Sequence, residues 1–79
     1  MEPIEVTAHF DREGQAHPLH FTWNGRTHAV ESIGRRWQHE GEQHILVMIP
    51  GDRVFELIFR PQDGRWYLRQ TGAGAPDLA

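Results

Sequence analysis

The stretch HFTWNGRTHAV, residues 20–30, contains the strongest short-range fold signal in the chain, which is Asn24-Gly25 between two segments rich in aromatic and β-branched residues. A two-residue type I′ turn needs a positive φ at both central positions, and Asn and Gly adopt that conformation most readily. We therefore predict a β-hairpin. In that register three cross-strand pairs share one face of the sheet: Trp23 with Arg26, Phe21 with His28, and Leu19 with Val30.

Strand-like segments follow on both sides of this hairpin. IEVTAHF, residues 4–10, alternates apolar and polar residues and is typical of a half-buried strand. HILVMI, residues 44–49, contains five apolar residues in succession. Such a run indicates either a central strand covered on both faces or an edge strand that another chain covers.

The segments between these strands predict one irregularity and two loops. The alternation in VESIGRRW, residues 30–37, breaks at Gly34, which predicts a β-bulge that redirects the strand. DREGQAHP, residues 11–18, is rich in turn formers and is predicted as a loop of about six to eight residues, with Pro18 near the start of an edge strand. QHEGEQ, residues 38–43, is polar and is also predicted as a loop.

A second hairpin is predicted within RVFELIFRPQDGRWYLRQT, residues 53–71. Its turn is either the two residues Asp63-Gly64 or the four residues 61–64, and the register differs by two between these alternatives. Both alternatives place the same side chains on the inner face: Phe55, Leu57, Phe59, Trp66 and Leu68.

No segment has the apolar period of a helix of useful length, so the chain is predicted to be all-β. The expected architecture is a strongly bent antiparallel meander, or a small SH3-like barrel, of about six short strands. Residues 1–71 are expected to form a single β domain, and residues 72–79, which are small and polar, a flexible C-terminal tail.

Composition disfavours several classes of function. The chain of 79 residues has no cysteine, no lysine and one serine, which removes thiol nucleophiles, disulfides, Schiff-base lysines and the phosphate-binding lysine of a P-loop. Its net charge of −3 argues against holding nucleic acid by bulk attraction to phosphates. No apolar run reaches the roughly 20 residues of a membrane span, and no signal peptide is evident. We expect a cytoplasmic protein that is not an enzyme and needs no cofactor.

The pattern F-x-W-x-G-R-x-x-x-V, followed by R-W and a late W-x-L strand, resembles a small family of bacterial domains of unknown function. The residues that carry the resemblance are Phe21, Trp23, Gly25, Arg26, Val30, Arg36 and Trp37, and the match spans most of residues 4–70. Domains of this kind occur alone or at the C-terminus of ImuB-like proteins, which are catalytically inactive relatives of Y-family polymerases in mutagenic DNA repair. The resemblance implies an adaptor role close to nucleic acid.

The tryptophans and arginines are the candidate binding residues. Most of the tryptophans are expected in the core, because a small sheet needs large side chains to bury enough apolar area. The alternative is that some are exposed as stacking platforms between arginines. Since adjacent strand residues face opposite ways, at least one of Arg35 and Arg36 is expected to point outward. The predicted binding residues are Arg26, Arg35, Arg36, Trp37 and Arg65.

The six histidines are not predicted to form a metal site, because their spacing gives no complete set of three or four ligands. His39 and His44, for example, flank a predicted loop. His28 is expected to be partly buried and hydrogen-bonded to the backbone. Glu56 is expected to be a charge on an edge strand that discourages aggregation.

These observations favour a non-catalytic interaction or adaptor module, associated through the resemblance with DNA repair. A protein partner is expected to dock on an exposed strand edge or on the Arg/Trp face, by strand addition or by formation of a homodimer. Single-stranded nucleic-acid binding through the Arg/Trp face is the first alternative. A metal-dependent enzyme is the second.

Overall fold

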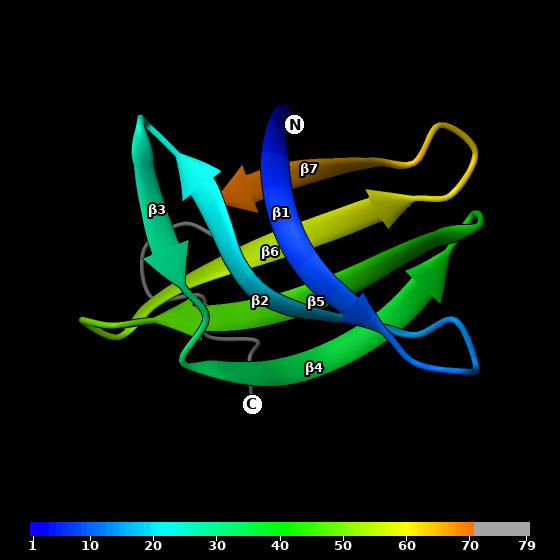
Figure 1. The fold of residues 1–79 in the computed structure, drawn as a ribbon, viewed down its shortest axis with the longest axis horizontal. Helices are drawn as coiled ribbons and strands as arrows, with labels where there is room; N and C mark the ends of the chain where they lie inside the picture. Colours follow the sequence, from blue (N-terminus) through cyan, green and yellow to red (C-terminus); the bar gives the residue numbers. More distant parts are fainter. Residues whose placement is uncertain (71–79) are drawn as a thin grey trace.

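The computed structural model describes residues 1–70 and confirms the all-β prediction, with no helix in that range (Figure 1). The tail predicted at residues 72–79 lies outside the described residues. No helix in residues 1–70 is long and apolar enough to cross a membrane. There are seven strands: β1 (Glu2–Phe10), β2 (Ala16–Trp23), β3 (Arg26–Ala29), β4 (Ser32–His39), β5 (Glu42–Ile49), β6 (Arg53–Arg60) and β7 (Arg65–Gln70).

The strands form one antiparallel sheet in the order β3-β2-β1-β7-β6-β5-β4, which curls into a half-barrel. The two edge strands, β3 and β4, are consecutive in sequence, so the chain passes directly from one end of the sheet to the other (Figure 1). Backbone hydrogen bonds fix this passage: the Val30 N–H donates to Leu19 O at 2.9 Å, and the Glu31 N–H donates to Met48 O at 2.7 Å.

The inner face of the curled sheet holds the hydrophobic core. The side chains predicted to point inward from the second hairpin are buried, except Phe59, which is partly buried against the core. The core residues are Ala16, Phe21, Trp23, Ile45, Val47, Ile49, Phe55, Leu57, Trp66 and Leu68.

The turn at Asn24-Gly25 is as predicted, with φ values of 54° and 74°. Phe21 pairs with His28 and Trp23 with Arg26, which confirms two of the three predicted pairs. Leu19 was expected to share their buried face but is 53% exposed. The cause is a bulge between β1 and β2, where consecutive β1 residues pair with His20 and Pro18 and leave Leu19 as the extra residue.

The predicted loop at residues 38–43 is wrong, because β4 and β5 run on to a two-residue turn at Glu40-Gly41. Both turn residues have a positive φ, 52° and 79°, as a type I′ turn requires. The separation of β3 from β4 gives seven strands instead of about six. The loop predicted at residues 11–18 is also shorter, because β2 begins at Ala16.

Two alternatives left open by the sequence are decided by the sheet. The second hairpin has the four-residue turn, because Arg60 pairs with Arg65 and the Gly64 N–H donates to Arg60 O at 2.9 Å. The apolar run of β5 belongs to an internal strand between β4 and β6. Leu46 of this strand is also buried, although it lies between the core residues Ile45 and Val47 and points to the opposite face of the sheet. The predicted bulge is present as a register shift between Ile33 and Arg36.

Candidate functional site

Strand β4 turns its candidate binding residues to two opposite faces of the sheet. Arg36 pairs with Ile45, a core residue of β5, and points inward with it. Trp37 pairs with His44 and points outward. Arg35 shares the outer face, because its guanidinium carbon lies 5.5 Å from the centroid of the Trp37 ring. The expectation that one of the two adjacent arginines points outward is confirmed, and the two arginines serve different sites.

The remaining two candidate residues lie elsewhere. Arg26 is exposed on β3, opposite Trp23. Arg65 is exposed at the start of β7, which β5 and β6 separate from β4. The structure therefore brings only Arg35 and Trp37 into contact among the five predicted binding residues.

Trp37 is the tryptophan that the core does not use. Trp23 and Trp66 are only 9% and 8% exposed and belong to the core, as expected for most tryptophans. Trp37 is half-buried on the outer face, where its ring stacks on His44 with centroids 5.2 Å apart and planes inclined by 16°. We call the group formed by Arg35, Trp37, His44 and Glu56 the Trp37 patch.

The base of the Trp37 patch is a buried polar pair between β5 and β6. His44 Nδ1 donates to Glu56 Oε2 at 2.7 Å, and both side chains are less than one tenth exposed. The other polar atom of the ring is Nε2. Within residues 1–70, this buried Nε2 has no hydrogen-bond partner and lies 3.7 Å from Glu42 Oε1. The pair fixes the imidazole plane on which Trp37 lies.

Glu56 differs from its expected role as an edge charge. It lies on β6, an internal strand, and is 7% exposed. The nearest cation to its second oxygen is Arg69, at 4.0 Å. The sequence does not reveal this role, because it depends on the register of β5 with β6, in which Ile58 directly faces His44 and Glu56 lies two residues away, diagonally across the strands.

Charged residues of alternating sign surround the patch. Arg60 Nε donates to Glu42 Oε2 at 2.7 Å, and this hydrogen bond raises the pKa of the guanidinium above its ordinary value. The Arg60 guanidinium also lies over the Tyr67 ring, 4.5 Å from its centroid. The Tyr67 hydroxyl donates to Asp63 at 3.3 Å. Carboxylates thus neutralise Arg60 on this face.

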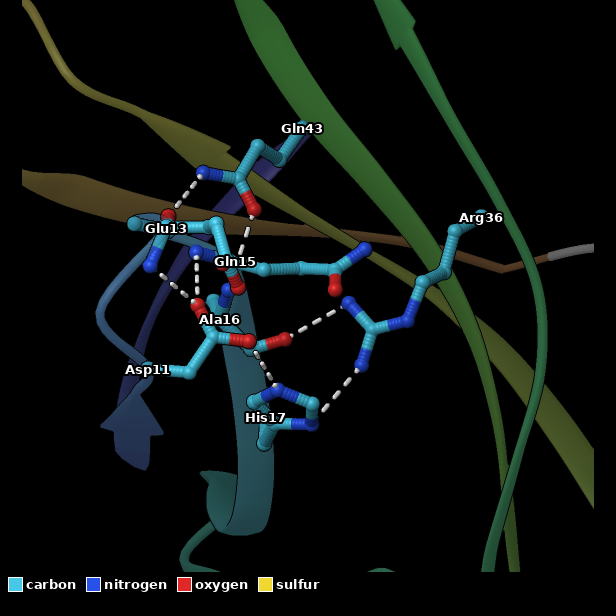
Figure 2. A network of polar contacts seen from close by, with 8 residues as sticks. Asp11, Glu13, Gln15, Ala16, His17, Arg36 and Gln43 are labelled. Carbon is cyan, nitrogen blue, oxygen red and sulfur yellow. Dashed lines mark hydrogen bonds and ion pairs between the residues drawn. The ribbon is translucent and has the colours of Figure 1, made fainter.

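A second polar site lies where the start of β2 approaches β4 and β5. The Gln43 side-chain amide accepts from the Ala16 N–H at 3.2 Å and donates to Gly14 O at 3.0 Å. Arg36 Nη1 donates to Ala16 O at 2.7 Å (Figure 2). Both backbone polar groups of Ala16 are therefore satisfied by side chains from the other end of the sheet, in place of a neighbouring strand.

A chain of side-chain hydrogen bonds, which we call the relay, continues this network to the loop between β1 and β2. Arg36 Nη2 donates to His17 Nδ1 at 3.2 Å, and His17 Nε2 donates to Asp11 Oδ2 at 3.0 Å (Figure 2). The His17 hydrogen bond, together with those from the Gln15 and Glu13 backbone, holds the pKa of Asp11 below its ordinary value. We call the junction formed by Asp11, Gly14, Ala16, His17, Arg36 and Gln43 the β2–β4 seam.

A cleft of about 400 Å³ opens beside the seam. Arg36 lies in it, and the Gln15 side chain extends toward the Arg36 guanidinium (Figure 2). Three of the lining residues are glutamines, and Arg36 and Glu13 are also among them. The lining residues are Glu13, Gly14, Gln15, Arg36, Trp37, Gln38, Gln43, His44 and Ile45.

The histidines of residues 1–70 were also compared with the requirements of a metal centre. Within the described part of the chain, no group of three or more His, Asp or Glu side chains is arranged to hold a metal ion. His28 is partly buried between Phe21 and Trp23, as expected. Its Nε2 has no hydrogen-bond partner in residues 1–70, so the expected backbone hydrogen bond is not made at that atom.

Comparison with protein-family models, with curated proteins and with solved structures found no match. The arguments on function below therefore rest on the geometry and chemistry of these two sites.

Proposed function

We propose that this domain is a non-catalytic interaction module and that a protein partner docks on the Trp37 patch. One observation carries the proposal: Trp37, with Arg35 above its ring, lies outside the core on a rigid base of His44 and Glu56. Tryptophan and arginine are the residue types most enriched among those that dominate binding energy in protein interfaces. A ring already fixed by stacking loses little conformational freedom when a partner binds.

The strand edges are less suited to a partner than this face. Edge β3 has only four residues. Edge β4 has a bulge before Arg36, and Arg36 itself is an inward-pointing charge. The start of β2 extends beyond its pairing with β3. There the backbone polar groups of Ala16 are already bonded, and Pro18 has no N–H. Short strands, bulges, inward charges and prolines are the features that discourage strand addition. Docking on the face is therefore the better-supported mode.

Charge on the outer face favours a partner that combines apolar and acidic side chains. Arg35 and Arg65 have no carboxylate within 4.0 Å among residues 1–70, whereas Arg60 is paired with Glu42. An acidic partner residue gains a charge-assisted hydrogen bond from Arg35. An apolar one covers the exposed part of Trp37.

Single-stranded nucleic acid is less compatible with the same face. His44 occupies one side of the Trp37 ring, and Arg35 lies over the ring as well. A phosphate backbone would also meet the carboxylates of Glu42 and Asp63 around the patch. The association with DNA repair rests on the resemblance and stays a prediction, as does the absence of enzymatic activity.

The test compares capture of partners from a lysate of the source organism by the wild-type domain, Trp37→Ala, Arg35→Glu and the matched control Arg26→Glu. We expect a partner that the wild type and the control capture equally well. The amount captured by each of the two patch variants should be at least tenfold lower. A partner that also depends on Arg26, or equal capture by all four proteins, contradicts docking on the Trp37 patch.

A titration with a short oligonucleotide at low salt addresses the alternative. Tryptophan quenching in the wild type that disappears in Trp37→Phe would favour nucleic-acid binding at the patch. Under the proposal, no saturable quenching is expected.

A further inference from the structure

Arg36 carries a partly buried positive charge without a counterion. No carboxylate lies within 4.0 Å of its guanidinium among residues 1–70, and its contacts are Ala16 O and the neutral ring nitrogen His17 Nδ1. The nearest acid in the network is Asp11, which is reached only through His17. Partly burying an arginine without an anion costs free energy, and proteins usually pair such charges.

The guanidinium also has unused donors. Arginine has five N–H groups in a planar fork. Within the described residues, only one bond from Nη1 and one from Nη2 are made to protein acceptors. Among residues 1–70, Nε and the second hydrogen of each terminal nitrogen have no protein acceptor. Arg36 is one of the residues that line the cleft beside the seam.

The surroundings of Arg36 suit an anion of low charge. The amides of Gln15, Gln38 and Gln43 line the same cleft and provide further N–H donors. Glu13 is the only acid among the lining residues, and it is exposed. The lining has one arginine and one carboxylate, and the protein has a net charge of −3. This balance favours a ligand with a single negative charge over a phosphate dianion.

We propose that this cleft is a carboxylate-binding site in which the free N–H groups of Arg36 hold the ligand. The guanidinium fork matches the two oxygens of a carboxylate. The cleft borders the Trp37 patch, because Trp37 and His44 also line it, but Arg36 and Trp37 point to opposite faces of β4, and the inference does not rest on the proposed function. The carboxylate belongs either to a free small acid or to an acidic side chain of a peptide.

The first experiment supplies the ligand from within the chain. Gln15→Glu is close to isosteric and places a carboxylate on the side chain that extends toward Arg36 (Figure 2). It is expected to raise Tm and to weaken binding of an external carboxylate at least tenfold, because the site is then occupied. An unchanged Tm together with unchanged binding overturns the proposal.

Binding is measured by NMR on the full 15N-labelled chain, from the Arg36 Nε–H and Ala16 N–H signals. The probes are sodium acetate and a capped tetrapeptide containing one Glu, with sodium chloride and the matching Gln peptide as controls at equal ionic strength. We expect saturable shifts with a carboxylate probe only. Saturation by acetate identifies a free acid as sufficient, and saturation by the Glu peptide alone identifies an acidic side chain.

The adjacent arginines provide matched variants. Arg36→Lys keeps the charge but loses the fork, and it is expected to weaken binding about tenfold. Arg35→Gln removes a charge from the opposite face and is expected to change affinity less than twofold. The absence of saturable shifts in the wild type, or an equal loss in Arg35→Gln, overturns the proposal whether or not the Arg36 variant folds well.

Discussion

Two junctions hold the strands β1–β3 against the strands β4–β7, and the contacts at the two junctions are of different kinds. At the β1–β7 junction, backbone ladders pair Glu2 with Leu68, Pro3 with Tyr67 and Ile4 with Trp66. At the β2–β4 seam, the side chains of Arg36 and Gln43 bond to the backbone of residues 14–16. Backbone pairing depends little on residue identity, whereas a junction made by side chains depends on a few specific residues. The seam is therefore the place where one substitution can loosen the half-barrel locally.

The largest expected effect comes from the core that both junctions share. Leu57 is fully buried on β6, between the two. Leu57→Ala should lower the free energy of unfolding by about 2–5 kcal/mol, through lost apolar burial and a residual cavity. Urea denaturation followed by tryptophan fluorescence measures it. Hydrogen exchange should then accelerate at both junctions, and acceleration confined to the seam would contradict a common core.

An intermediate effect is expected from the seam alone. Gln43→Ala removes two hydrogen bonds to residues 14–16, each worth about 1 kcal/mol, and leaves the Ala16 N–H without its partner. Hydrogen exchange at Ala16 should accelerate at least tenfold, while amides of β6 and β7 change much less.

Gln38→Ala is the matched control, because Gln38 pairs with Gln43 across β4 and β5 but makes no bond to the seam within residues 1–70. It should leave Ala16 exchange nearly unchanged. Equal acceleration by both variants would show that the Gln43 amide does not hold the seam.

The smallest effect is expected from the outer end of the relay, at the half-buried Asp11. Its pKa is lowered in the folded state by the His17 hydrogen bond, so the ionised form stabilises the fold above the unfolded value of 3.8. This contribution is lost as the pH falls through the folded pKa. Asp11→Asn should lower Tm slightly at pH values above about 5, and the difference from wild type should shrink below about pH 4.

Thermal unfolding of both proteins across that pH range checks this prediction. A difference that grows with acidification would mean that Asp11 does not stabilise the seam as a carboxylate.

Local patterns predicted the hairpins and most of the core because their physical basis is local. The period-two alternation placed Phe55, Leu57, Trp66 and Leu68 on the buried face whichever turn joined the strands. The same reasoning failed at Leu19, because the bulge that turns it outward is created by the pairing of β2 with β1.

The predicted loop at residues 38–43 failed for a different reason. Its type I′ turn contains Glu40 at φ 52°, a conformation that glutamate adopts less readily than asparagine, so the turn signal in the sequence is weak. The polar composition of residues 38–43 is typical of a loop, although the residues on both sides of the turn belong to the strands β4 and β5.

The sequence by itself determined an all-β chain, its Asn24-Gly25 hairpin and most of the buried side chains of the second hairpin, since turn preferences and alternation act between neighbouring residues. Only the tertiary structure decided what meets across the sheet. The four hydrogen bonds of Arg36 and Gln43 at the seam join residues 19 to 29 positions apart. His44 and Glu56 likewise meet through the pairing of two strands. The order and curvature of the sheet produce these contacts, and both depend on long-range pairing of β1 with β7.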